Sequence, residues 1–112
     1  MKVNLQPWAI EYYNRRVQTW ADDLPSGIQA DFIHLLQRMR QHGPALGMPY
    51  VRMMGGGLYE VRAKGTEGTA RAFFCAVVGR RIVILHGFVK KTEQTPRYEI
   101  ELARKRLKEV NS

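Results

Sequence analysis

Two segments of the chain repeat apolar side chains at helical spacing. The first follows an i, i+4, i+7, i+8, i+11 pattern and predicts an amphipathic helix over residues 28–42, ended by Gly43-Pro44. Its apolar members are Ile28, Phe32, Leu35, Leu36 and Met39. The second begins after Thr95-Pro96, where a capping residue precedes Pro at the first helical position, and predicts a charged C-terminal helix. Its apolar members are Ile100, Ala103, Leu107 and Val110.

Most of the remaining chain consists of β-prone runs separated by turn residues. Strands are predicted over residues 8–13, 50–54, 58–63, 69–78 and 81–89, and a short helix over residues 14–21. The first strand follows Pro7, which favours a sheet edge. Turns are predicted at Gly55-Gly56-Gly57, over residues 64–68 and at Gly79-Arg80.

The order of these elements is a strand, two helices, a meander of strands and a terminal helix. Helices segregated from a meander predict an α+β domain, in which a small, largely antiparallel sheet packs on an N-terminal helical hairpin. The second face of the sheet is expected to stay partly open. A chain of 112 residues has room for one such domain, over residues 1–112.

The lengths of the apolar runs and the first residues of the chain indicate where the protein is located. The longest apolar runs fall far short of the ~20 residues that a membrane span requires, and the first residues lack the apolar core of a secretion signal. We therefore expect no membrane association and a cytoplasmic location. Cys75, the single cysteine, lies within an apolar run and is interpreted as a small buried hydrophobic residue rather than a catalytic thiol.

Charge is the most informative bulk property. Eighteen Lys and Arg against ten Asp and Glu give a net charge of +8. Residues 59–112 hold twelve of the basic and six of the acidic residues, so most of the excess lies in the second half. A nucleic acid, a ribosome, a membrane surface or an acidic protein would each suit such a surface.

Strand parity places two arginines together. Alternate side chains of a strand point to opposite faces, so Leu58, Glu60 and Arg62 share one face of their strand. Arg71 is central in the next strand. If the hairpin brings Arg62 and Arg71 to one open face, the two guanidinium groups repel each other, and an anionic ligand would relieve that cost.

Further polar side chains cluster near the end of the last strand and the start of the final helix. Lys90 and Lys91 follow an apolar run and are either a solvated strand end or part of a basic site. His86 is either a general acid or base, or a histidine satisfied at a strand end. Tyr98 either stacks on a base or packs. The acidic residues are scattered and no CxxC or HExxH motif occurs, so no metal site and no cofactor are expected.

RNA cleavage is compatible with this inventory, because the ribose 2′-OH is an internal nucleophile beside the scissile phosphate. The protein must supply a proton acceptor, cations for the developing negative charge and a proton donor for the leaving oxygen. Arg suits the second role because its planar fork matches phosphate oxygens. A Lys near other cations has a lowered pKa and is therefore suited to accept the proton.

Several motifs together carry a family resemblance. They are Gly57-Leu58-Tyr59-Glu60-Val61-Arg62, Ala70-Arg71-Ala72-Phe73-Phe74, residues 84–92 (Ile-Leu-His-Gly-Phe-Val-Lys-Lys-Thr), Thr95-Pro96, and Glu99-Ile100 with Ala103 and Arg106. In combination they resemble the HigB-type branch of the RelE/ParE toxins, and the early strand and the Leu46–Pro49 loop also fit.

The resemblance implies a RelE-like fold and metal-independent cleavage of mRNA on the translating ribosome, which inhibits translation. It also implies a helix-turn-helix antitoxin of the HigA type as partner. Carried over by position, Arg62 and Arg71 correspond to phosphate-stabilising arginines, and Lys90 and Lys91 to a basic pair that supports proton transfer. Glu60, His86 and Tyr98 are supporting candidates.

Two other functions remain open at this level. A ParE-like relative would poison DNA gyrase by contact, without catalysis, and one fold can host both activities. A non-toxic regulator would bind nucleic acid with an affinity that falls steeply with salt. The basic strand-end cluster favours the ribonuclease.

Overall fold

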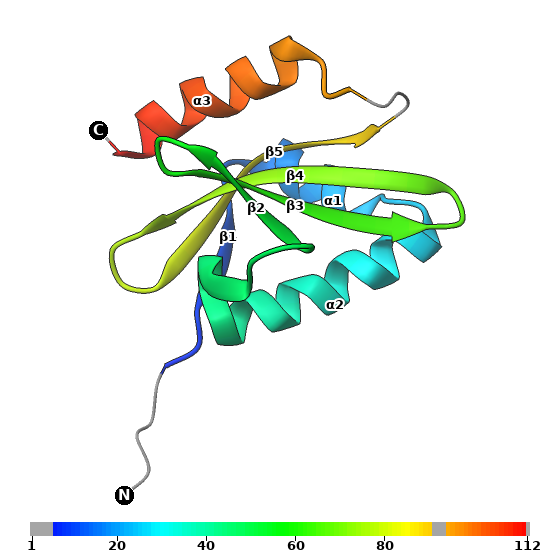
Figure 1. The fold of residues 1–112 in the computed structure, drawn as a ribbon, viewed down its shortest axis with the longest axis horizontal. Coiled ribbons are helices and arrows are strands. Elements are labelled where there is room, and N and C mark those ends of the chain that lie inside the picture. Colours follow the sequence, from blue (N-terminus) through cyan, green and yellow to red (C-terminus); the bar gives the residue numbers. More distant parts are fainter. Residues whose placement is uncertain (1–5, 91–93, 112) are drawn as a thin grey trace, which may run out of the picture.

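A computed structural model describes residues 6–90 and 94–111 (Figure 1). Its elements, in chain order, are β1 (Ala9–Tyr12), α1 (Arg15–Asp22), α2 (Ser26–His42), the short 3-10 helix η1 (Gly43–Leu46), β2 (Val51–Gly55), β3 (Leu58–Gly65), β4 (Gly68–Val77), β5 (Arg81–Lys90) and α3 (Arg97–Asn111). The predicted order of strand, two helices, strands and terminal helix is confirmed, and the domain is α+β.

The strands form one five-stranded sheet in the order β1-β5-β4-β3-β2. The meander from β2 to β5 is antiparallel, but β1 pairs with β5 in parallel, so the sheet is mixed. β1 lies at the sheet edge, as Pro7 indicated. The expected loop over residues 64–68 is shorter in the structure, because β3 and β4 continue as far as Gly65 and Gly68.

The first two helices cover one face of the sheet. Each packs mainly on a strand, α1 on β5 and α2 on β3, so the expected helical hairpin is not confirmed. The Asn14 side chain caps α1 by accepting a hydrogen bond from the Val17 N–H at 3.0 Å. All five apolar residues predicted for the inner face of α2 are buried, as expected.

The second face of the sheet is partly covered by α3 (Figure 1) and partly open, as the sequence indicated. A second core joins the helix to the strands there, formed by Leu58, Phe73, Cys75, Val83, Leu85, Ala103 and Leu107. Cys75 is 1% exposed, and burial raises the pKa of its thiol, so it behaves as the small buried residue that was predicted. None of the helices in the described ranges combines the length and apolar character needed to cross a bilayer.

Candidate functional site

Arg62 of β3 and Arg71 of β4 lie directly opposite each other in the sheet. Opposite residues of an antiparallel pair point to the same face. That face is the one α3 partly covers, because Phe73, two residues from Arg71, belongs to the second core. The convergence of the two arginines predicted by strand parity is therefore confirmed.

A bulge in β5 brings Lys90 to the same face. Phe74 pairs with Ile84 but Phe73 pairs with His86, so one extra residue, Leu85, is accommodated in β5. The extra residue inverts the alternation of side chains beyond it. Without the bulge Lys90 would point towards α1 and α2; with it, Lys90 lies opposite Thr69 on the arginine face.

A second bulge, in β2, brings Arg52 to the same face, and the sequence analysis did not identify this arginine. Gly55 pairs with Leu58 but Met53 pairs with Tyr59, so Met54 is the extra residue in β2. Arg52 thereby lies opposite Glu60 rather than opposite Val61. The sequence shows that Val51 and Arg52 point to opposite faces of their strand. No local signal indicates the bulge that decides which face Arg52 takes.

Glu60 lies between the two predicted arginines and is 1% exposed. Nη1 of Arg71 donates to both of its carboxylate oxygens at 3.1 Å, and Nε of Arg62 donates to Oε1 at 3.2 Å. The repulsion expected between the arginines is thus relieved by a carboxylate of the chain itself, before any ligand binds. Arg71 is 6% exposed, and its Nε has no hydrogen-bond partner among the described residues.

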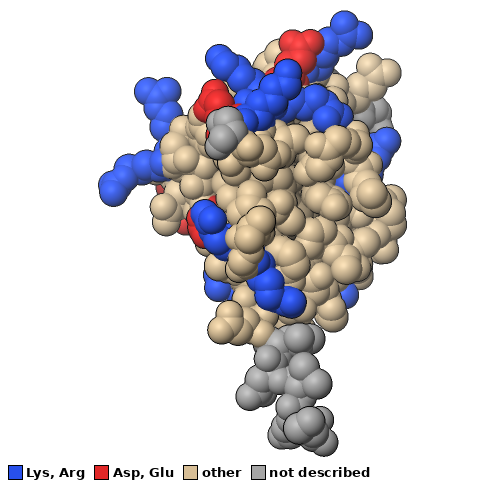
Figure 2. Space-filling view, turned by 90° about the vertical axis from the view of Figure 1, so that its left-hand side faces the viewer, with Lys and Arg blue, Asp and Glu red and all other residues tan. Residues whose placement is uncertain are grey.

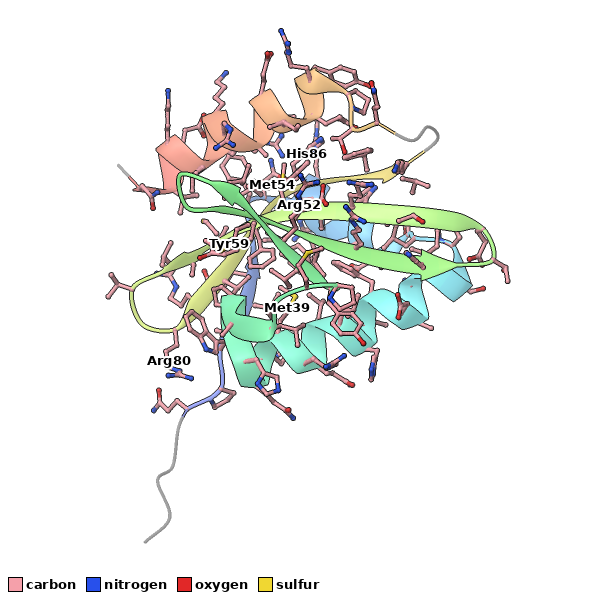
Figure 3. All side chains as sticks on the ribbon, in the orientation of Figure 1. Met39, Arg52, Met54, Tyr59, Arg80 and His86 are labelled. Carbon is pink, nitrogen blue, oxygen red and sulfur yellow. The ribbon has the colours of Figure 1, made fainter. Side chains whose placement is uncertain are left out.

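These side chains line a cavity of about 450 Å³ beneath the start of α3. Its walls are Arg52, Met54, Glu60, Arg62, Arg71, Gln94, Thr95 and Ile100. Figure 3 shows Arg52 and Met54 on the side of the sheet that faces α3, with Met39 on the opposite side. Three arginines from three neighbouring strands face one carboxylate, which leaves a surplus of two positive charges. Guanidinium groups in this arrangement suit a phosphate or another oxyanion. We call this hollow the arginine cavity.

A smaller hollow of about 220 Å³ adjoins it, because Gln94 lines both. Lys90 and Tyr98 contribute to its walls, and Tyr98 is 68% exposed. The structure therefore brings these two candidates next to the arginine cavity. Lys91 lies outside the described residues.

His86 is not part of either hollow. Its Nε2 lies 2.8 Å from Oε1 of Glu99 on α3, and its ring stacks on Phe88. It faces a separate crevice between α1, β5 and α3. Of the candidates in the described ranges, His86 thus lines neither hollow, although its neighbours Phe88 and Glu99 line the smaller one.

The family model of phage-derived, Gp49-like proteins (DUF891) matches residues 19–108. The chain belongs to the Gp49-like family. This is a family of RelE/ParE-like toxins of toxin–antitoxin systems in general. No curated protein matches the chain.

The matched range of this Gp49-like chain contains every strand that lines the arginine cavity and nearly all of α3. Figure 2 shows Lys and Arg side chains gathered at the upper end of the molecule, where α3 lies. The basic residues of that helix are Arg97, Arg104, Lys105, Arg106 and Lys108. A basic helix beside a positively charged cavity is the electrostatic arrangement that favours a polyanionic ligand.

Proposed function

We propose that this Gp49-like protein is the toxin of a HigB-type pair with a RelE-like fold, and that it cleaves mRNA on the ribosome without a metal ion. The convergence of Arg52, Arg62 and Arg71 on one cavity carries the proposal. One carboxylate offsets only one of the three charges. A site of this kind binds a phosphate group and stabilises additional negative charge on it.

Cleavage would proceed by attack of the ribose 2′-oxygen on the adjacent phosphorus. A bond forms between these two atoms and the bond from phosphorus to the 5′-oxygen breaks, which leaves a cyclic phosphate and a free 5′-hydroxyl. One proton leaves the 2′-hydroxyl and another reaches the 5′-oxygen. Arg62, the more accessible of the predicted arginines with 29% of its side chain exposed, would contact the phosphate first.

The adjoining hollow supplies groups for the remaining steps. Lys90, with Lys91 beside it in the sequence, supports proton transfer, and the exposed Tyr98 ring is placed to stack on a base. Glu60 is a positioning residue, because both of its oxygens are engaged by arginines. His86 has no direct role in this proposal, since it faces a different crevice.

The proposal includes a cytoplasmic location, where ribosomes are, and a helix-turn-helix antitoxin of the HigA type as partner. Apolar side chains exposed around β2 support a protein partner, since such groups on one surface mark interaction sites. Met48 and Met53 are 67% and 76% exposed. Co-purification of the protein with the product of a neighbouring helix-turn-helix reading frame would test this part.

Cleavage is tested by inducing the protein and its variants in growing cells and mapping new mRNA 5′ ends. We expect the wild-type chain to stop growth and cut mRNA, and Arg62→Ala to reduce cleavage roughly 10²–10³-fold, the usual loss when one donor to a developing oxyanion is removed. Arg40→Ala is the matched control, because Arg40 is an exposed cation of α2, on the other face of the sheet, that lines none of these hollows.

Intact mRNA together with DNA breaks and an SOS response would instead identify a gyrase poison. Full cleavage by the Arg62→Ala variant would contradict the role given to the arginine cavity. Absence of any growth effect, with salt-sensitive nucleic-acid binding, would indicate a regulator.

A further inference from the structure

A crevice of about 240 Å³ lies between α1, β5 and α3, apart from the two hollows described above. Its lining residues are Arg16, Val17, Trp20, His86, Gly87 and Arg106. None of these is acidic, and two are arginines from different helices. The two arginines give the crevice a positive charge, which the Glu99 carboxylate beside His86 offsets in part, and the proposed cleavage chemistry does not use it.

The floor of the crevice depends on Gly87. A Cβ atom at this position would lie 2.1 Å from the ring of Trp20, so only glycine lets α1 approach β5 this closely. Trp20 is further held by an edge-on contact with Phe32 of α2, with 6.2 Å between ring centroids. Backbone and aromatic ring therefore form rigid walls, and the hollow is part of the folded structure.

Arg106 is fixed in position at one wall. Its Nη1 donates to the carbonyl oxygen of Leu85 at 2.7 Å, and its guanidinium lies 4.7 Å from the centre of the Tyr13 ring. Neither Arg106 nor Arg16 forms a salt bridge among the described residues. An immobilised guanidinium that lacks a carboxylate keeps its capacity to bind an external oxyanion at little entropic cost.

The size of the crevice indicates what kind of anion it accepts. Small-molecule sites usually enclose about 300–1,000 Å³, so this hollow suits one phosphate of a longer chain better than a free cofactor. α3 borders both this crevice and the arginine cavity, through Arg106 and Ile100. The two residues are six positions apart, about 9 Å along the helix axis and on opposite flanks of it, so a nucleic-acid strand that contacts both hollows would pass around α3.

We propose that the crevice between Arg16 and Arg106 binds a backbone phosphate of the same single-stranded RNA whose cleavage is proposed for the arginine cavity. The inference rests on the proposed function for the identity of the ligand. It adds a second contact that fixes the register of the strand, since phosphate contacts position a nucleic acid without reading its sequence.

The test measures binding of a fluorescein-labelled oligouridylate that is 2′-O-methylated throughout and so cannot be cleaved. Fluorescence anisotropy gives the binding constant over a series of salt concentrations. Each neutralised phosphate of a single strand contributes about 0.7 to the slope of log K against log salt. We expect Arg16→Ala to lower the slope by about that amount and Arg16→Lys to retain it.

Arg15→Ala is the matched control, because Arg15 is an exposed neighbour on the same helix that does not line the crevice. Its slope should equal that of the wild type. Equal losses for the Arg15 and Arg16 variants would mean diffuse attraction and overturn the inference. The inference would also be overturned if Arg16→Ala left the slope unchanged but weakened binding of an acidic protein partner. The crevice would then be a binding site for a protein.

The outcomes separate this inference from the proposed function. If the wild-type chain cuts no mRNA in cells but the slope still depends on Arg16, the phosphate site stands and the ribonuclease proposal fails. If mRNA is cut but Arg16→Ala leaves the salt slope unchanged, the ribonuclease proposal stands and the proposed phosphate site in the crevice is wrong.

Discussion

Glu60 determines the electrostatic character of the arginine cavity. A carboxylate that is 1% exposed is costly to bury, and here its charge is compensated by three hydrogen bonds from two arginines. The pairing also holds Arg71 beneath the surface, so Arg62 and Arg52 are the guanidinium groups most accessible to a ligand. One buried acid thus sets both the net charge and the orientation of the cations.

Replacement of Glu60 by Ala should lower the free energy of unfolding by about 3–5 kcal/mol, because it leaves the Arg71 charge buried without a counter-ion. Urea denaturation measures this. The double variant Glu60→Met, Arg71→Met should recover much of the loss, because apolar residues of similar volume often replace a buried ion pair without cost. Glu101→Ala on the exposed face of α3 is the control and should change stability by less than about 0.5 kcal/mol. If Glu60→Ala lowered the free energy of unfolding by no more than Glu101→Ala does, the interpretation of Glu60 and Arg71 as a buried ion pair would be contradicted.

At the scale of elements, the β3–β4 turn stabilises the start of α2. Pro25 at the N-cap provides no capping side chain. The Glu67 carboxylate instead accepts hydrogen bonds from the backbone N–H groups of Gly27 at 2.9 Å and Ile28 at 3.1 Å. The bond from Gly27 is the main reason that the pKa of Glu67 is lowered. A residue distant in sequence therefore performs the function that a local cap usually performs.

This arrangement predicts an acid-dependent contribution to stability. Because the pKa of Glu67 is lower in the folded chain than its ordinary value of 4.5, the stabilisation is complete above that value and is lost as pH falls through the folded pKa. Glu67→Gln should unfold at a lower temperature at neutral pH, and the difference from wild type should shrink in acid. Thermal unfolding followed by circular dichroism over a pH series measures this, and a difference that stays constant with pH would contradict it.

At the scale of the molecule, the sheet separates two cores. One lies under α1 and α2, and the other joins the sheet to α3. Because α3 forms a wall of the arginine cavity as well as a cover for the second core, the stability of that core and the shape of the cavity depend on the same helix.

Leu107 tests this dependence, since it is buried in the second core but lines none of the three hollows described. Leu107→Ala should cost about 2–5 kcal/mol through lost burial and a residual void. Lys108→Ala, one position along and exposed, should be nearly neutral. Chemical denaturation compares the two. Similar stabilities for both variants would show that α3 does not depend on this core.

The sequence by itself determined the elements, the faces of the helices and the convergence of Arg62 with Arg71, because helical and strand periodicity are local properties of the chain. It also indicated Cys75 as a core residue. Tertiary structure decided the rest: the parallel pairing of β1, the faces of Arg52 and Lys90, and the position of His86 in a crevice beside α1. The physical reason is that a single bulged residue inverts a period of two, and whether a strand accommodates one depends on the partner it pairs with.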